Sequence, residues 1–223
     1  MPTSIDYPAV ALQALQKAWA ATARDYDLRR LNSERCVQAS IYHHLRKELK
    51  APGFTVYVEP YLSIGGAKPC YVDLLIVHSG RVVLALELKY KPSSKPSRRS
   101  VAADLSKLIQ LKHRRASVDR TGIVIRRFLA EKQEKLHLEV APRSFAVFAA
   151  FVKESAFSTT RKAFWDEHRN DTVAPNGAPA KSMPNRLVTL IAATKLSGKA
   201  STVAWAKPKA AQRVSEPSQR SVA

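Results

Sequence analysis

Two short apolar runs, residues 71–77 and 81–90, constrain the fold of this chain more than any other feature. Both runs are rich in Val and Leu, and the three residues between them include Ser79 and Gly80, which is typical of two strands joined in a β-hairpin. Each run also carries charge, since Asp73 lies in the first and Glu87 and Lys89 lie in the second. Charge inside apolar sequence is costly unless it is compensated, which makes these residues the strongest signal in the chain.

The register of the hairpin decides whether the two carboxylates share a face. Within the second strand, Glu87 and Lys89 lie on one face about 7 Å apart. A two-residue turn would place Asp73 opposite Leu86 and separate the acids. A three-residue loop that ends in a bulge would place Asp73 opposite Ala85, and Glu87 is then its diagonal neighbour on the same face.

Two carboxylates at that separation repel each other unless a cation or a proton lies between them. The carboxylates of Asp73 and Glu87, with the carbonyl oxygen of Leu88 and water, are hard oxygen donors that suit Mg²⁺ or Mn²⁺. Lys89 would then orient or help to deprotonate a metal-bound water and stabilise phosphorane charge. The pattern therefore predicts hydrolysis of phosphodiester bonds.

Two helices are expected before the hairpin. Residues 8–24 are Ala-rich with apolar side chains along one face, and a second helix should begin after Asn32 or Ser33. In that second helix, Glu34 falls on the same stripe as the apolar residues, so it is expected to point toward the sheet. The alternative is an ordinary acid in a first helical turn, where the helix dipole favours negative charge.

The order of the expected elements predicts an α/β fold with a mixed central sheet flanked by helices. Strands are expected over residues 54–62 and 144–152, and a crossover helix over residues 101–115. Residues 123–140 and 186–196 each leave strand and helix as alternatives.

The net charge indicates a polyanionic partner. Thirty-seven Lys and Arg against 18 Asp and Glu give +19, which exceeds what solubility requires of a small domain. The two cysteines cannot build a disulfide framework or a four-thiolate zinc site, and no apolar run reaches the roughly 20 residues that cross a bilayer. We expect a soluble, cytoplasmic protein without a membrane partner, with one domain over 1–206 and a disordered basic tail over 207–223.

Basic residues directly after the second hairpin strand are expected to contact phosphates on either side of the bond that is cut. Residues 91–100 contain two prolines, four serines and four basic residues, which predicts a mobile loop. An ordinary solvated face is the alternative for the basic residues of the crossover helix. The predicted phosphate contacts are Lys91, Lys95, Arg98, Arg99, Lys107, Lys112, Arg114 and Arg115.

The constellation resembles the PD-(D/E)XK nuclease superfamily, which has the restriction-endonuclease-like fold, in the branch whose core begins with a Glu-bearing helix. The resemblance covers residues 32–152. It implies that Asp73 and Glu87 are metal ligands, that Lys89 is the catalytic lysine, and that Glu34 ligates or tunes the metal. The chain departs from the family pattern in having Val rather than Pro before the first acid.

Two further polar residues are candidates for this site. Gln110 resembles a glutamine motif of exonuclease-type relatives in the same superfamily, against the alternative of a solvent-facing polar residue. Glu59 lies either near the metal or, as we favour, at the end of a strand that it caps before Pro60.

The sequence as a whole predicts a nuclease that depends on Mg²⁺ or Mn²⁺ and acts on DNA rather than RNA. The alternative is a catalytically inactive nucleic-acid-binding or assembly protein that retains the nuclease fold. The oligomeric state is left open, a dimer included.

Overall fold

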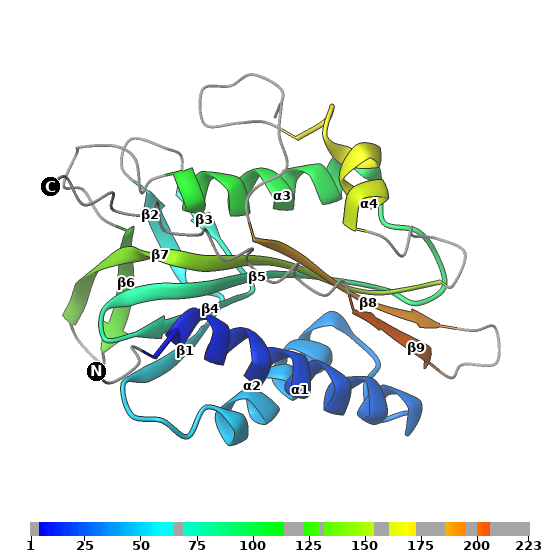
Figure 1. Cartoon of the computed structure of the whole chain (residues 1–223), viewed down its shortest axis with the longest axis horizontal. Helices are drawn as coiled ribbons and strands as arrows, with labels where there is room; N and C mark the ends of the chain where they lie inside the picture. The colour runs from blue at the N-terminus through cyan, green and yellow to red at the C-terminus, as the bar shows by residue number, and fades with distance from the viewer. Residues whose placement is uncertain are drawn as a thin grey trace, which may run out of the picture.

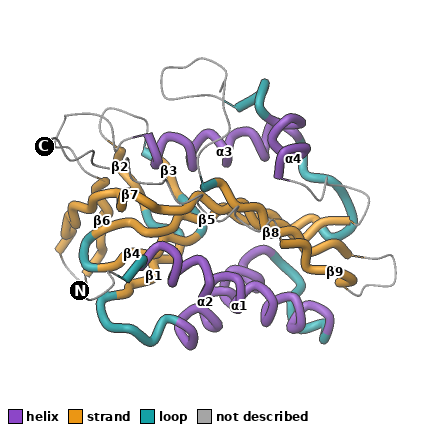
Figure 2. Tube along the Cα trace, in the orientation of Figure 1, coloured by secondary structure: helices purple, strands orange, loops and turns teal. Residues whose placement is uncertain are grey.

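The computed structural model shows an α/β protein in which helices cover both faces of a mixed β-sheet (Figures 1 and 2). Helices α1 (Tyr7–Asp27) and α2 (Glu34–Glu48) lie on one face, and α3 (Arg98–His113) and α4 (Arg161–His168) lie on the other. No helix in the described part of the chain is long and apolar enough to span a membrane. The structure describes residues 5–64, 69–113, 123–129, 132–153, 161–172, 186–194 and 200–205.

The main ladder of the sheet has the order β1-β4-β5-β7-β8-β9. Its centre is parallel, because β5 pairs with β7 and β7 with β8 in the same direction, whereas the flanking pairs are antiparallel. Helix α3 follows β5 and crosses over the sheet, which is how a chain can return to a parallel neighbour. The strands are β1 (Phe54–Val58), β4 (Leu74–His78), β5 (Arg81–Lys91), β7 (Lys132–Lys153), β8 (Leu187–Thr194) and β9 (Ala200–Trp205).

Strand β7 is long enough to join a second ladder. Its first part pairs with β6 (Ile123–Leu129), which pairs in turn with β2 (Tyr61–Ile64), and β2 pairs with the short β3 (Cys70–Tyr71). Because β3 ends two residues before Asp73, this second ladder borders the start of β4.

The two helical layers bury separate apolar clusters against the sheet. On the α1–α2 face, Trp19 packs on Phe151 with ring centroids 4.8 Å apart. On the α3–α4 face, Phe148 packs on Phe164 with centroids 5.2 Å apart. Residues 148 and 151 are an odd number of positions apart, so they emerge on opposite faces of β7. The C-terminal part of β7 is therefore buried on both sides, as expected of a central parallel strand.

The two predicted N-terminal helices are confirmed, and local capping explains where they start. The Asp6 carboxylate accepts a hydrogen bond from the Ala9 N–H at 3.3 Å, and the Ser33 hydroxyl accepts one from the Cys36 N–H at 3.2 Å. Each cap satisfies a backbone donor that the first turn of the helix leaves without an internal partner.

Of the two turns that the sequence left open, the β4–β5 hairpin has the two-residue one, so the three-residue loop that would have placed the acids on one face is wrong. His78 pairs with Arg81, and both turn residues have positive φ, 47° at Ser79 and 77° at Gly80. Such a turn matches the twist of the two strands. A bulge at Val83 then shifts the register by one residue, so that Leu74 pairs with Leu86 rather than with Ala85.

The bulge has a direct consequence for the acids. Asp73 directly precedes β4, and extending the pairing of Leu74 with Leu86 by one residue places Asp73 opposite Glu87. Asp73 therefore does not pair with Ala85. The extra residue in β5 shifts the register so that the acids share a face in spite of the two-residue turn. The two acids lie closer than the diagonal arrangement that the sequence predicted.

Other elements also differ from the sequence-based expectation. The expected strand over residues 54–62 is two strands, since Glu59 has a φ of 45° and Pro60 follows it between β1 and β2. Helix α3 begins at Arg98, inside the stretch expected to be a loop, and α4 was not predicted. The alternatives over 123–140 and 186–196 resolve as strands in the described part of both segments. The tail over residues 207–223 lies outside the described residues.

The hairpin turn yields a prediction about stability. Gly80 has φ of 77° and a Cβ added there meets no atom within 4 Å, so Gly80→Ala should cost only the left-handed backbone, about 1–2 kcal/mol. Gly53 has φ of 87°, and its added Cβ would lie 3.0 Å from both the His78 and Ser79 side chains, so Gly53→Ala should cost more. Urea denaturation of both variants measures the difference. Equal losses, or a neutral Gly80→Ala, would contradict this account of the turn.

Candidate functional site

Asp73 is held in place by three different parts of the fold. The Leu88 N–H of β5 donates to Asp73 Oδ2 at 2.6 Å. The backbone carbonyl of Asp73 accepts one hydrogen bond from Gln38 Nε2 of α2 and another from the Glu59 N–H, each at 3.0 Å. Asp73 therefore has a fixed position although it belongs to no strand.

Glu87 points from β5 toward α3 and is only 2 % exposed. The ammonium group of Lys107, on α3, lies 2.8 Å from Glu87 Oε1 and 3.1 Å from Asp104 Oδ1. The same ammonium donates to the Tyr71 carbonyl oxygen at 3.2 Å. One lysine thus joins β5, α3 and β3 at a single point.

Lys89 lies on the same face of β5 as Glu87, as the strand alternation predicted. Its Nζ lies 2.7 Å from Asp104 Oδ2. Asp104 therefore accepts from both lysines, one on each carboxylate oxygen. We call Asp73, Glu87, Lys89, Asp104 and Lys107 the acid–lysine cluster.

Glu34 is the first residue of α2, and its carboxylate lies beside the acid–lysine cluster. Its side chain is exposed, not buried as the helical stripe predicted. It nevertheless turns toward the sheet, since Glu34 Oε2 accepts a hydrogen bond from the Tyr90 N–H at 3.0 Å. The carboxylate also raises the pKa of Asp73, which places its charge within electrostatic reach.

Burial is the main influence on the pKa values of Asp73 and Glu87. It raises the pKa of Asp73, against the Leu88 N–H bond that favours the ionised form, and Glu34 adds to the rise. Burial also raises the pKa of Glu87 well above its usual range, and the neighbouring charges of Asp104 and Asp73 act in the same direction. Negative charge at these two positions is therefore unfavourable without a cation nearby.

The pKa values of the two lysines are also raised, which for a base favours the charged form. Burial alone would lower the pKa of Lys89, but the Asp104 carboxylate outweighs it and the pKa rises. For Lys107, the Glu87 and Asp104 carboxylates likewise outweigh burial and raise the pKa. Both groups therefore stay charged, and the cluster is a network of ionised lysines between acids.

The oxygen donors of the cluster are of the type that a hard divalent cation prefers, but they are too few to surround the ion completely. Asp73 and Glu87 offer carboxylate oxygens of raised pKa, and the Leu88 carbonyl is a further oxygen donor. Within the described residues, no group of three or more His, Cys, Asp and Glu is arranged to hold a metal ion. An ion bound here would therefore have two carboxylate ligands and keep several waters, which is the usual state of Mg²⁺ in proteins.

The predicted phosphate-contacting residues fall into separate groups. Lys91 and Arg99 are exposed. Lys95 binds the Glu167 carboxylate and Arg98 Nη2 donates to the Glu167 carbonyl oxygen at 2.8 Å, so this pair contacts α4. Lys107 was expected on the surface that contacts phosphates, but its ammonium turns into the acid–lysine cluster because Glu87 and Asp104 lie beneath it. The side chain of Lys112, and the whole of Arg114 and Arg115, lie outside the described residues.

The two remaining candidates contribute less than the cluster. Gln110 is half-buried on α3, one turn beyond Lys107. Glu59 has an exposed side chain and acts through its backbone N–H, which fixes Asp73. This agrees with the favoured interpretation of Glu59 as a strand-end residue.

Sequence reasoning missed Asp104 and Gln38. Asp104 carried a signal, because it falls on the apolar stripe formed by Val101, Leu105 and Leu108 of the crossover helix. As with Glu34, an acid on an apolar stripe is expected to point toward the sheet, and a carboxylate buried there needs a cation nearby. Gln38 also falls on the stripe of its helix, three residues before Ile41, but a neutral amide on such a stripe is a weaker signal than a carboxylate because it costs less to bury.

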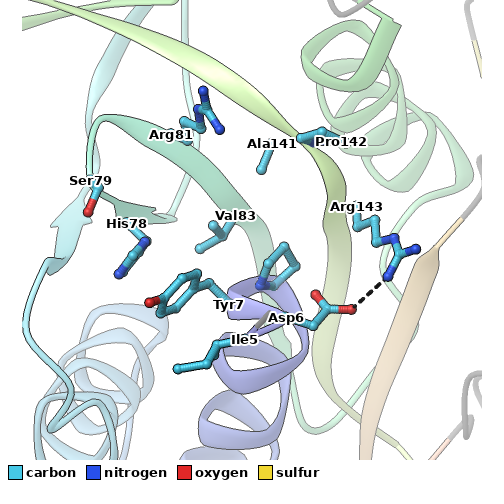
Figure 3. Close-up of a pocket in the computed structure, with 11 residues that line it drawn as sticks. Ile5, Asp6, Tyr7, His78, Ser79, Arg81, Val83, Ala141, Pro142 and Arg143 are labelled. Atoms are coloured by element: carbon cyan, nitrogen blue, oxygen red, sulfur yellow. Dashed lines mark ion pairs between the residues drawn. The ribbon is translucent and has the colours of Figure 1, made fainter. Parts of the chain in front are cut away.

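A cavity of about 680 Å³ lies between the start of α1 and the β4–β5 turn, as Figure 3 shows. The Tyr7 ring stacks on His78 with centroids 3.6 Å apart, and Arg143 approaches Asp6 at 3.6 Å. Arg81 also lines this cavity, six residues before Glu87 along β5, or about 20 Å at strand spacing. The cavity is therefore separate from the acid–lysine cluster.

Comparisons with protein-family models, curated proteins and solved structures find no match to this chain. The functional argument therefore depends on the geometry of the site.

Removing the Lys107 ammonium should expose the unfavourable charge of the cluster. Lys107→Met keeps the side-chain length but leaves Glu87 and Asp104 without that cation, so the free energy of unfolding at pH 7 should fall by about 3–5 kcal/mol. The loss should shrink as the pH falls toward 5, because the Glu87 carboxyl, whose pKa is raised, takes up a proton and loses the charge that destabilises the fold. Denaturant unfolding at several pH values measures both effects.

The matched control is Lys17→Met. Lys17 pairs with Glu48 at 3.2 Å on the surface, with side chains 60 % and 36 % exposed, so its loss should cost less than about 1 kcal/mol and vary little with pH. If the two variants lose similar stability, the cluster does not depend on the Lys107 charge.

Proposed function

We propose that this chain is a metal-dependent nuclease that uses Mg²⁺ or Mn²⁺ to hydrolyse phosphodiester bonds in DNA. One observation carries the proposal. The bulge in β5 puts Asp73 opposite Glu87 at the end of the hairpin, with Lys89 next along the same face of the strand. In this proposal the mixed sheet and its helices form a restriction-endonuclease-like core of the PD-(D/E)XK superfamily.

The proposed roles follow from the position of each side chain. Asp73, Glu87 and the Leu88 carbonyl would hold the ion, with Glu34 close enough to bind or tune it. When bound, the ion would polarise the phosphate and make a water more acidic. Lys89 would stabilise negative charge on the phosphate, and its donation to the Asp104 carboxylate would keep the ammonium oriented and protonated.

The overall charge supports a nucleic-acid substrate. A formal +19 favours association with a polyanion, and Lys91 and Arg99 project from the segment that follows Lys89. Positive residues beside a metal-binding carboxylate pair would hold the phosphate backbone on either side of the bond that is cut.

A second candidate function has its own supporting observation. Both lysines of the cluster are already paired with protein carboxylates, as in a structural ion network. This arrangement favours a catalytically inactive nucleic-acid-binding or assembly protein that retains the fold. Calorimetric titration with Mn²⁺ separates the two, because a protein that only binds nucleic acid has no need to hold the ion.

Substitutions in the cluster test the catalytic proposal. Lys89→Ala should abolish cleavage of plasmid and linear DNA in Mg²⁺ while Mn²⁺ binding persists, because the lysine acts on the reacting phosphate. Asp73→Asn should abolish both, since it removes a charged ligand while its side-chain oxygen can still accept from the Leu88 N–H. Lys50→Ala, at an exposed position beyond α2, is the control and should cleave normally. Near-normal cleavage by Lys89→Ala would overturn its assigned role.

The salt dependence of binding tests the proposed path of the DNA. Replacing Lys91 and Arg99 together by Ala should reduce the slope of log K against log salt by up to about two units, at roughly 0.9 per phosphate contact on duplex DNA. Replacing Lys95 and Arg98 should reduce it less, because these groups already bind Glu167. Fluorescence anisotropy in EDTA measures both slopes. A larger effect of the second pair would place the DNA along α4 instead.

A further inference from the structure

An exposed aromatic side chain borders the acid–lysine cluster. Tyr71 is 58 % exposed and lies two residues before Asp73. Its carbonyl oxygen accepts a hydrogen bond at 3.2 Å from the Lys107 ammonium, which also contacts Glu87 at 2.8 Å. The backbone that carries this ring is therefore tied directly to the candidate catalytic acids.

A second ring supports Tyr71. Tyr61 is its partner across the β2–β3 pair, and the two ring centroids lie 5.1 Å apart with the planes inclined at 59°. The Lys107 bond and the Tyr61 contact thus hold Tyr71 from two sides. A ring held in this way can stack on a ligand with little further loss of conformational freedom, which favours binding.

Single exposed apolar residues are common on protein surfaces, so exposure alone is not evidence. The position of Tyr71 is the stronger argument, because its strand leads directly into Asp73. A phosphate bound at Asp73, Glu87 and Lys89 would bring the bases of the same strand to the border of the cluster. Bases that are stacked within a duplex cannot lie flat on a tyrosine, whereas an unpaired base can.

We propose that Tyr71, supported by Tyr61, stacks on an unpaired base next to the phosphate bound at the acid–lysine cluster. The substrate class would then be single-stranded nucleic acid, or duplexes with frayed or flapped ends. This inference rests on the proposed function only in that the cluster is where the phosphate binds. It adds that the strand enters past β3 as a single strand.

The test measures binding rather than cleavage, so it does not depend on activity. Anisotropy is recorded with Ca²⁺ in place of Mg²⁺, so that an oxygen-liganded cation is present at the cluster without the catalytic ion, and with single-stranded and blunt hairpin duplex oligonucleotides of equal charge. Tyr71→Ala should weaken single-strand binding by about 5- to 140-fold, the equivalent of 1–3 kcal/mol for one stacked base, and leave duplex binding nearly unchanged. Tyr71→Phe keeps the ring and should bind like the wild type. Ile5→Ala removes an apolar side chain that is 62 % exposed at the far end of β5, and should have no effect.

A set of oligonucleotides carrying 2-aminopurine or an abasic site at successive positions locates the stacked base. The fluorescence of 2-aminopurine should be quenched at one position in the wild type and in Tyr71→Phe, and should recover in Tyr71→Ala. An abasic site at that position should weaken the wild type but not Tyr71→Ala. Equal loss of single-strand and duplex binding in Tyr71→Ala, or no position-specific quenching, would overturn the inference.

These outcomes are distinct from failure of the nuclease proposal. If no variant binds Mn²⁺ or cleaves DNA but the stacking results hold, the protein is a single-strand binder and the catalytic proposal is wrong. If cleavage is metal-dependent but Tyr71→Ala binds both substrates like the wild type, only the stacking inference fails.

Discussion

The arrangement of this site depends on the ion pair that neutralises the buried Glu87 carboxylate. A carboxylate with 2 % exposure is tolerable only if a cation neutralises it or a proton is bound. The Lys107 ammonium provides that cation, and it comes from α3, the helix that crosses between β5 and β7. The apolar face of α3 packs on the sheet through Val101, Leu105 and Leu108, and the ion pair adds a directional constraint on the rotation and height of the helix. The charge network therefore fixes the position of the layer above the sheet.

The same network explains why one extra residue in β5 matters. A two-residue turn without a bulge would turn Asp73 and Glu87 to opposite faces of the hairpin. The bulge at Val83 restores a shared face for the acids while keeping the tight turn at Ser79 and Gly80. It also moves Val83 to the α1–α2 face, where it packs with Leu84. The bulge therefore leaves apolar side chains of β5 packed in the clusters on both faces of the sheet.

Much of this arrangement could be predicted from the sequence, and the limits have physical reasons. The alternation along β5 placed Glu87 and Lys89 on one face, and apolar periodicity with capping residues located α1 and α2. The bulge could not be predicted, because Val83 is one of several consecutive apolar residues and nothing in its chemistry distinguishes it from Val82. Lys107 resembled the other basic residues of its helix, and the positions of Glu87 and Asp104 beneath it turn it inward. Local patterns thus located four members of the candidate site, whereas contacts between distant segments decided how those residues are paired.

The pairing of Lys107 with Glu87 creates a competition within the site. A divalent ion between Asp73 and Glu87 would interact with the same carboxylate that the ammonium now neutralises, and two cations on one carboxylate repel each other. Asp104 offers a resolution, since it already binds Lys107 at 3.1 Å and could retain the ammonium when an ion takes over Glu87. Asp104 would then hold both Lys89 and Lys107 while the ion is bound. An acid that accepts from two lysines would allow the cluster to be stable without metal and still accommodate the ion.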